Sequence, residues 1–559
     1  MRVMRKTAGL GAALAMSLVL AACGGSGPGS TGTGATPQSL ATQAQYNPQP
    51  RDNIKDGGTL TTALPEISAQ FNPFQGDATL YSRTVWNWYN PLLITFTPTG
   101  DAVFNKDYLA DVKEETVDGN TKITYTINPK ATYNDGTPID WRTFEATWKA
   151  DSAADPAYVV LSSDGYNRIA SVTPGVDDRQ AIVTFKGINV WWPGLFNNVL
   201  NPKALAPDVF NKGYVNTPHL EWGAGPYVIS KFEQQNGVIT FERNPKWWGD
   251  KGKLDTRTFL VMEDSASINA FRNGQIDATG VSTADRLAQV KDMPGIDIRR
   301  SMTTGTFLFT LNSKSPVLAE TAVRKAVFEG IDRVQLGKIL HQGLDYSEDP
   351  PGSLNLLSFQ KGYQDNVSKV IRFDPEQAKK DLEAAGWVAG PDGTRTKNGQ
   401  PLKITYVNTG DNPVVKATAT ATAAMLKNIG VTLDIQQVPS SEFSSIVSGR
   451  KFDMFFSGFQ MGDPYGVAYI CQVYCSDSQL NVSGTGQPAL DEQVKAVNTL
   501  PTPEEQFAKA NEVETEALKT YGVLPVDNGP TIVAVKKGLA NYGAGLFFTP
   551  LPQDIGWQK

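Results

Sequence analysis

Gly223-Ala224-Gly225-Pro226-Tyr227, followed by Glu242-Arg243-Asn244-Pro245-Lys246-Trp247-Trp248-Gly249, is the most informative pair of segments in this 559-residue chain. Glycine adopts conformations closed to other residues and proline fixes its own φ, so Gly225-Pro226 predicts a rigid turn. Arg243, Trp247 and Trp248 are expected to pack or form ion pairs within one structural unit. We therefore interpret both segments as the framework of a fold.

Strands and helices alternate on both sides of this framework. Residues 122–127 alternate polar and apolar side chains, which is the period of a half-buried strand. The clearest helix is predicted over residues 374–385, with Asp374 as N-cap and Pro375 in the first helical position. Further predicted elements are strands at 57–64 and 431–437 and helices at 82–93 and 417–428. This order predicts a mixed α/β fold with helices packed on sheets.

The first residues predict export from the cytoplasm. Arg2, Arg5 and Lys6 precede an uncharged run at 8–20 that is shorter than the ~20 residues of a membrane-spanning helix. Residues 1–22 are therefore predicted to be a cleaved secretory signal. Leu20-Ala21-Ala22-Cys23-Gly24 resembles the bacterial lipobox, which makes Cys23 the predicted site of lipidation and the first residue of the mature chain.

The segment after Cys23 has the composition of a linker. Residues 24–50 carry almost no charge and are dominated by Gly, Ser, Thr, Gln and Pro. Such a segment offers little apolar surface to offset the entropy of ordering. We predict a flexible tether over residues 23–56, which would keep the protein close to a membrane partner.

Charge and size restrict the class of protein. Fifty-seven acidic and 51 basic residues give a net charge of −6, and removing the three basic residues of the signal leaves 48 basic residues and about −9. An acidic chain of this kind is a poor partner for nucleic acid. About 500 ordered residues exceed what one hydrophobic core supports, so two or three lobes with a cleft between them are expected.

The mature chain retains two cysteines, Cys471 and Cys475. Export places them in an oxidising compartment, which favours a local disulfide. A metal site needs more ligands, and the two histidines, His219 and His341, have no His or Cys at a ligand spacing. A redox pair is disfavoured because the spacing is CxxxC instead of CxxC. No metal and no cofactor are expected.

The sequence offers little that is typical of an enzyme. It lacks the GxxxxGK[ST] phosphate loop, so the chain is not expected to hydrolyse ATP. Ser448-Gly449-Arg450-Lys451 matches the SxxK pattern, but no KTG or SDN accompanies it, and an exposed turn explains it better. No acidic pair has a spacing that marks an acid and a base. We expect a protein that is not an enzyme.

Several segments, taken in order, resemble the family 5 extracellular solute-binding proteins of ABC importers, which carry oligopeptides, dipeptides and nickel complexes. The resemblance covers about residues 57 to 550, and the pair of segments at 223–227 and 242–249 is its most specific part. Other matching segments are Gly57-Gly58-Thr59-Leu60, Phe71-Asn72-Pro73, Tyr89-Asn90-Pro91-Leu92-Leu93, Tyr133-Asn134-Asp135-Gly136-Thr137-Pro138, Asn273-Gly274-Gln275-Ile276-Asp277, Val323-Arg324-Lys325-Ala326 with Ile331-Asp332-Arg333, and Phe373-Asp374-Pro375-Glu376-Gln377-Ala378 with Ala385-Gly386-Trp387.

The resemblance implies a periplasmic-binding-protein-like α/β fold of the large three-lobed type II cluster, with two main mixed-sheet lobes joined by a hinge. The first lobe would comprise residues 57–93, 205–304 and 523–559. A small inserted second lobe would comprise 94–204, and the third lobe 305–522. Lobes of this kind close on a ligand and exclude water from its polar contacts.

The resemblance also implies where a peptide would bind. Peptide-binding members pair a carboxylate with the ligand's α-ammonium, and the matching stretch here runs from Ser457 to Tyr465 but is shorter by about two residues. One alignment makes Asp463 the ammonium partner; another makes it a structural Asp that caps the turn at Pro464, with the binding acid missing. Phe459 and Tyr465 are candidates for stacking on ligand side chains.

The opposite wall of the cleft is expected between the first strand and the first helix. Its candidate residues are Gln75, Asp77, Thr79 and Tyr81. Where some relatives use a basic residue for the peptide carboxylate, this chain has Val447, with Arg450 nearby. Longer or modified ligands are therefore also compatible with the sequence.

The leading prediction is a lipid-anchored, monomeric protein on the outer face of the cell membrane that passes short peptides to an ABC permease and its ATPases. An alternative is a lipoprotein of the same fold that senses or regulates envelope processes, or that binds a dedicated non-peptide ligand. Haem or nickel ligation would need a histidine in the cleft, and neither His219 nor His341 lies in a segment expected to line it.

Overall fold

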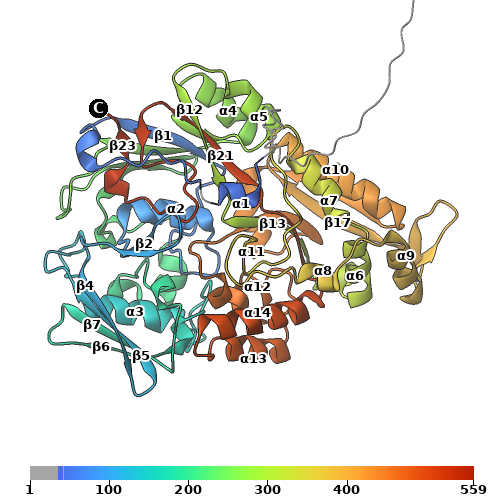
Figure 1. The fold of residues 1–559 in the computed structure, drawn as a ribbon, viewed down its shortest axis with the longest axis horizontal. Helices are drawn as coiled ribbons and strands as arrows, with labels where there is room; N and C mark the ends of the chain where they lie inside the picture. Colours follow the sequence, from blue (N-terminus) through green and yellow to red (C-terminus); the bar gives the residue numbers. More distant parts are fainter. Residues whose placement is uncertain (1–34, 42) are drawn as a thin grey trace, which may run out of the picture. The chain divides into compact units, whose positions relative to one another are not determined.

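The computed structural model describes residues 35–41 and 43–559, which contain three main β-sheets (Figure 1). Each sheet has a hydrophobic core of its own. The predicted signal at 1–22 and the predicted lipidation site Cys23 lie outside the described residues. Among the helices within 35–41 and 43–559, none is both long enough and apolar enough to cross a membrane.

The largest sheet has seven strands in the order β12-β21-β11-β1-β10-β9-β8, and its central strands β11, β1 and β10 are parallel. Its strands are β1 (Thr59–Leu64), β8 (Tyr227–Glu233), β9 (Val238–Arg243), β10 (Thr256–Val261), β11 (Ala278–Gly280), β12 (Ile296–Met302) and β21 (Pro530–Lys536). Helix α2 (Leu80–Tyr89) packs on this sheet through buried aromatic side chains, and Trp88 lies 5.4 Å from Tyr227 between ring centroids.

The two segments with which the sequence analysis began belong to the framework of this sheet. The backbone N–H groups of Ala224 and Gly225 donate to the carbonyl of Tyr89 at 3.0 and 2.9 Å. A Cβ atom on Gly225 would lie 2.9 Å from the Tyr89 Cα, so this approach of the chain to the end of α2 requires glycine. Arg243 pairs with Asp56 at 2.8 Å, and Trp248 donates to the Asp107 carbonyl at 2.8 Å.

The second sheet has four antiparallel strands in the order β4-β5-β7-β6. In the sequence, these strands fall between β1 and β8 of the first sheet. Its strands are β4 (Leu109–Val117), β5 (Asn120–Ile127), β6 (Ile169–Pro174) and β7 (Gln180–Phe185). Helix α3 (Trp141–Asp151) packs on β6 and β7 and begins after Asp140, whose side chain accepts the N–H of Arg142 at 2.9 Å (Figure 1).

The third sheet has five strands in the order β18-β17-β19-β13-β20. Its strands are β13 (Gly305–Leu311), β17 (Lys403–Thr409), β18 (Thr432–Val438), β19 (Met454–Gln460) and β20 (Val523–Asp527). Around it lie α6 (Thr321–Glu329), α7 (Arg333–Leu340), α9 (Pro375–Ala384), α10 (Pro413–Asn428), α12 (Ile470–Tyr474), α13 (Pro488–Val497) and α14 (Pro503–Leu518) (Figure 1). The predicted cap of α9 is present, because Asp374 accepts the N–H of Gln377 at 2.9 Å.

Two adjacent connections join the five-stranded and seven-stranded sheets. One leads from β12 to β13 and the other from β20 to β21, and the N–H of Thr303 donates to the carbonyl of Gly529 between them at 3.3 Å. The predicted return to the first lobe at residue 523 is wrong, because residues 523–527 form β20 and pair with β13. The sequence placed the boundary one strand too early.

Residues 43–56 pack against the C-terminal segment, so the predicted tether is wrong for this stretch. Ile54 is fully buried, and the ring of Tyr46 stacks on Phe548 with centroids 4.0 Å apart. The N–H of Asn541 donates to the Asn47 carbonyl at 3.0 Å. The segment is polar, but its backbone finds partners nearly 500 residues away, which local composition does not reveal.

Candidate functional site

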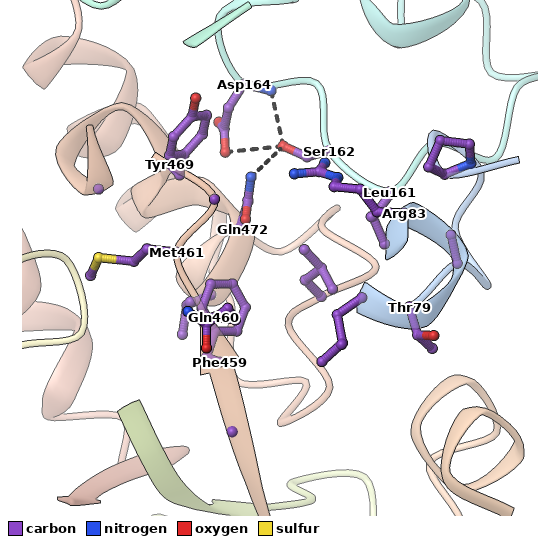
Figure 2. A pocket seen from close by; sticks show the side chains of 18 of the residues that line it. Thr79, Arg83, Leu161, Ser162, Asp164, Phe459, Gln460, Met461, Tyr469 and Gln472 are labelled. Atoms are coloured by element: carbon purple, nitrogen blue, oxygen red, sulfur yellow. Dashed lines mark hydrogen bonds between the residues drawn. The ribbon is translucent and has the colours of Figure 1, made fainter. Parts of the chain in front are cut away.

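The main cavity has a volume of about 480 Å³ and is lined by segments associated with all three sheets (Figure 2). This size lies within the ~300–1,000 Å³ of typical small-molecule sites. One wall comes from α2 and the loop before it, a second from residues 151–198, and the third from β19 and the segments that follow it. No histidine or cysteine is among the described residues that line it.

Helix α2 presents one polar face to the cavity. Leu80, Arg83, Thr84 and Asn87 line it, at the three- and four-residue spacing of a single helix face. The opposite face of α2 carries Trp86 and the other aromatic side chains that anchor the helix to its sheet. Arg83 is thereby held over the cavity by a buried helix, and it provides the positive charge of this wall (Figure 2).

Asp463 lies in the cavity wall after β19 and is held by two hydrogen bonds. Its Oδ2 accepts from the hydroxyl of Tyr469 at 2.7 Å, and its Oδ1 accepts the N–H of Tyr465 at 2.8 Å. Burial raises the pKa of Asp463 to about 6, against the opposing effects of these hydrogen bonds and of Arg83. An ionised Asp463 therefore gains from any cation that enters the cavity.

Two further buried carboxyl groups line the wall contributed by residues 151–198. Asp164 accepts from Ser162 at 3.2 Å, and Gln472 donates to the same Ser162 hydroxyl at 3.3 Å (Figure 2). Burial raises the pKa of Asp164 to about 7. Burial also raises the pKa of Asp151 well above its usual range, although the nearby Arg83 opposes this, and the Asp151 Oδ1 has no hydrogen-bond partner.

Replacing Asp164 by Asn is expected to change how stability depends on pH. The folded protein binds the Asp164 proton more tightly than the unfolded chain, because its pKa is about 7 when folded and about 4 when unfolded. The free energy of unfolding of the unmodified protein, relative to Asp164→Asn, should fall as pH rises from about 4 to about 7, by at most about 1.4 kcal/mol per pH unit. Urea unfolding of both ligand-free proteins at pH 5 and pH 8 measures this; the same difference at both pH values would contradict it.

The structure brings some of the predicted site residues together and leaves others out. Thr79, Phe459 and Asp463 line the cavity. Four predicted residues do not: Gln75, Asp77, Tyr81 and Tyr465. Val447, which stands where some relatives have a basic residue for the peptide carboxylate, lines the cavity. The nearby Arg450 does not line it.

The residues that miss the cavity have other contacts. Gln75 accepts the N–H of Asp77 at 2.7 Å, which stabilises the loop before α2. Tyr81 packs edge-on against Phe443 with ring centroids 6.2 Å apart. Tyr465 packs on Trp191 at 5.6 Å and joins the third wall to the second. These side chains support the walls of the cavity and are not part of its lining.

Arg83, Asp151 and Asp164 were missed by sequence reasoning. Arg83 could have been found from the sequence, because it lies on the polar face of the predicted amphipathic helix at 82–93. When the apolar face of such a helix packs on a sheet, its polar face is the one that can line a cavity. Asp151 is the last residue of α3 and Asp164 lies between α3 and β6, and no motif singles out either acid. Their position depends on packing between segments far apart in the sequence.

Cys471 and Cys475 form a disulfide with Cα atoms 4.6 Å apart. The bridge closes one turn around α12, whose residues Gln472 and Val473 line the cavity. The predicted disulfide thus holds part of the third wall in place.

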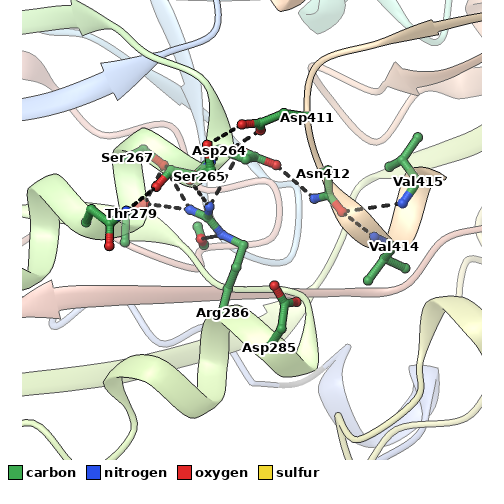
Figure 3. A network of polar contacts seen from close by, with 12 residues as sticks. Asp264, Ser265, Ser267, Thr279, Asp285, Arg286, Asp411, Asn412, Val414 and Val415 are labelled. Atoms are coloured by element: carbon green, nitrogen blue, oxygen red, sulfur yellow. Dashed lines mark hydrogen bonds and ion pairs between the residues drawn. The ribbon is translucent and has the colours of Figure 1, made fainter. Parts of the chain in front are cut away.

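A network of polar contacts connects the seven-stranded and five-stranded sheets at a second place (Figure 3). Asn412, at the start of α10, donates to Asp264 at 2.8 Å and accepts the N–H of Val414 at 2.9 Å. Arg286 is buried and donates to the backbone carbonyl of Asp264 and to the hydroxyl of Ser267. These contacts tie the start of α10, beside the five-stranded sheet, to residues 264–286 beside the seven-stranded sheet.

The chain is similar in sequence to a family of known proteins. Residues 106–481 match the profile of bacterial extracellular solute-binding proteins, family 5 Middle. The oligopeptide-binding protein OppA of Mycobacterium tuberculosis is 35% identical over 545 residues, which cover 95% of this chain and 90% of that protein. A probable monoacyl phosphatidylinositol tetramannoside-binding protein, LpqW, of the same species is 24% identical over 492 residues, covering 81% of this chain and 74% of that protein.

A solved structure shows the same fold. The oligopeptide-binding protein AppA from Bacillus subtilis, in complex with a nonapeptide, matches with a TM-score of 0.76 and 17% identity, covering 90% of this chain and all of that one. The likeness confirms the mixed α/β fold class that the sequence predicts.

Proposed function

The chain belongs to the bacterial extracellular solute-binding proteins of family 5, and from this premise we propose that it captures short peptides outside the cytoplasm and delivers them to an ABC importer. The resemblance stated from the sequence motifs is thereby confirmed at the level of the family. Capture is expected in the cavity between the three walls, with a membrane permease and its ATPases as partners.

The observation that carries the proposal is the charge pattern of the cavity. Asp463 and Arg83 lie in different walls of one cavity, which Asp151 and Asp164 also line. A peptide with free ends carries an α-ammonium that suits the acidic groups and a carboxylate that suits Arg83. Polar contacts of this kind gain strength when closure excludes water.

Asp463 is our proposed partner for the peptide α-ammonium. Its two oxygens accept one hydrogen bond each from the protein, and a carboxylate has further lone pairs for a ligand donor. The contact with the N–H of Tyr465 is also what a purely structural Asp would make. The two roles are compatible here, because the same side chain caps the turn and lines the cavity.

We further propose that the protein is anchored to the membrane and acts by binding alone. We expect Cys23 to carry a lipid that anchors a monomer to the outer face of the cell membrane, with the chain before residue 35 as its linker. We expect binding without catalysis, in line with a family of solute-binding proteins. No cofactor is needed for this role.

A second candidate is binding of a dedicated non-peptide ligand in an envelope process. It is favoured by the relative named for monoacyl phosphatidylinositol tetramannoside binding and by Val447 at the expected position of a carboxylate partner. Both candidates use the same cavity, so the occupant decides between them.

Native mass spectrometry of residues 24–559, compared with the denatured chain, tests the proposal. We expect a heterogeneous series of added masses that fragment as peptides, because a site that holds a peptide mainly through its backbone and its ends accepts many side chains. A single homogeneous mass that is not a peptide would favour the second candidate. A protein that stays empty and binds no member of a defined tripeptide to nonapeptide library would contradict peptide capture.

A further inference from the structure

A second cavity of about 280 Å³ lies away from the peptide cavity and shares no lining residue with it. Three ionisable side chains meet in its wall: His341 at the end of α7, Glu348 in the following loop and Asp527 at the end of β20. Their side chains are only 7%, 4% and 7% exposed. Neither the proposed peptide site nor the framework motifs account for this cluster.

The three side chains converge on one point. His341 Nε2 lies 2.5 Å from Asp527 Oδ1 and 4.0 Å from Glu348 Oε1, and ligand atoms of all three residues lie within 4.8 Å of one another. Despite this proximity, His341 Nε2 and Asp527 Oδ1 have no aligned hydrogen-bond partner. Buried polar atoms are normally paired, and here two close buried atoms lack hydrogen-bond geometry, which leaves lone pairs of both side chains available to a ligand.

The local charges favour a cation as that ligand. Two carboxyl groups share this buried site with one imidazole, and Asp527 Oδ1 and Glu348 Oε1 both approach His341 Nε2. The two basic side chains in the cavity wall do not neutralise them. Arg333 donates instead to the carbonyls of Pro351 and Pro525 at 2.8 and 3.1 Å, and Lys338 is exposed and makes no ion pair with either acid.

We propose that His341, Glu348 and Asp527 form a binding site for one divalent metal ion of the zinc class. Imidazole nitrogen and carboxylate oxygen are both ligands that zinc accepts, and three protein ligands leave the fourth position of a tetrahedral site open. Metal–ligand bonds of about 2.0–2.2 Å place tetrahedral ligands roughly 3.3 Å apart. The observed separations of 2.5 and 4.0 Å lie on either side of that value, so small side-chain movements suffice.

The surroundings would hold Glu348 in place for this role. Its Oε1 accepts the N–H groups of Asn528 and Gly529 at 2.6 and 3.1 Å, and its Oε2 accepts from the hydroxyl of Tyr346 at 2.7 Å. Hydrogen bonds of this kind orient metal ligands and tune their affinity. Asn528 and Gly529 form the connection between β20 and β21, so the ion would brace one of the two connections between the main sheets.

The test uses zinc alone as the probe, on protein purified without a histidine tag and labelled with ¹³C at the histidine Cε1 positions. Because the chain has two histidines, its imidazole spectrum contains two signals. We expect one Zn²⁺ per chain by chelator competition, a shift of the His341 signal alone, and a higher melting temperature with zinc than with chelator.

Matched variants separate this site from incidental binding. His341→Gln should weaken zinc binding at least about tenfold, whereas His219→Gln should leave it unchanged. Glu348→Gln, which keeps an acceptor for Asn528, should weaken zinc binding similarly and guards against misfolding of the histidine variant. Failure to bind zinc at tens of micromolar, a shift of the His219 signal instead, or full binding by both His341→Gln and Glu348→Gln would overturn the proposal.

Discussion

Replacing Glu514 by Leu is expected to lower the stability of the lobe built on the five-stranded sheet by about 3–5 kcal/mol. Glu514 lies in α14 and is 1% exposed. Its carboxylate accepts from Ser353 Oγ at 2.6 Å, Leu354 N at 2.8 Å, Asn366 Nδ2 at 2.8 Å and Tyr474 Oη at 3.2 Å. Leucine has a similar volume but leaves three buried donors without an acceptor and leaves Asn366 Nδ2 with only its bond to Asn511 Oδ1.

The magnitude follows from the cost of unpaired donors. Each buried polar group that loses its partner costs about 1–3 kcal/mol, and partial relaxation reduces the sum. For a lobe of this size the loss corresponds to a fall of roughly 10 °C in the melting temperature. Differential scanning calorimetry of the ligand-free protein measures this shift.

Glu512→Gln is the matched control on the same helix. Glu512 is exposed and pairs with Lys509 at 2.8 Å on the surface, so its replacement should change stability by less than about 0.5 kcal/mol. Equal melting temperatures for Glu514→Leu and Glu512→Gln would show that the buried network does not stabilise the lobe.

The parts of the fold that could be predicted from the sequence have local signals. The helix at Pro375–Ala384 was found within one residue at each end, because its cap, its proline and its apolar spacing all lie within a dozen residues. The framework segments around Gly225 and Arg243 were interpreted correctly for a related reason. Turns, caps and large aromatic side chains restrict the chain wherever they occur.

The candidate site was predicted only in part, because it depends on contacts between distant segments. Asp463 and Thr79 were placed in the cavity, but the register of the loop before α2 was not determined by its sequence. Gln75 forms hydrogen bonds within that loop, and one helical turn after Thr79 it is Arg83 that faces the cavity. The packing of residues 43–56 was missed for the same reason, since its partners lie near the C-terminus.

Replacing Asp463 by Asn is expected to weaken the binding of peptides with a free amino terminus by about 30- to 1,000-fold, or about 2–4 kcal/mol. N-acetylated peptides of the same sequence should change by less than about threefold, because they carry no α-ammonium. Asn retains an oxygen that can accept the N–H of Tyr465, so the turn should persist. Isothermal titration calorimetry with both peptide series measures the two affinities.

Asp77→Asn is the matched control, because this exposed acid was assigned to the opposite wall by sequence but lies outside the cavity lining. It should leave both affinities nearly unchanged. A pH series adds a second readout: with the pKa of Asp463 at about 6 in the empty protein, lowering pH from 7 to 5 protonates Asp463 while the peptide α-amine stays mostly charged, and it should weaken free-amine peptides by about tenfold. Asp463→Asn should reduce that dependence to the part contributed by Asp164, whose pKa of about 7 makes it titrate over the same range in the same cavity. Equal losses for free and acetylated peptides would instead assign Asp463 a purely structural role, and the ammonium partner would then have to be Asp151 or Asp164, the other buried acids that line the cavity.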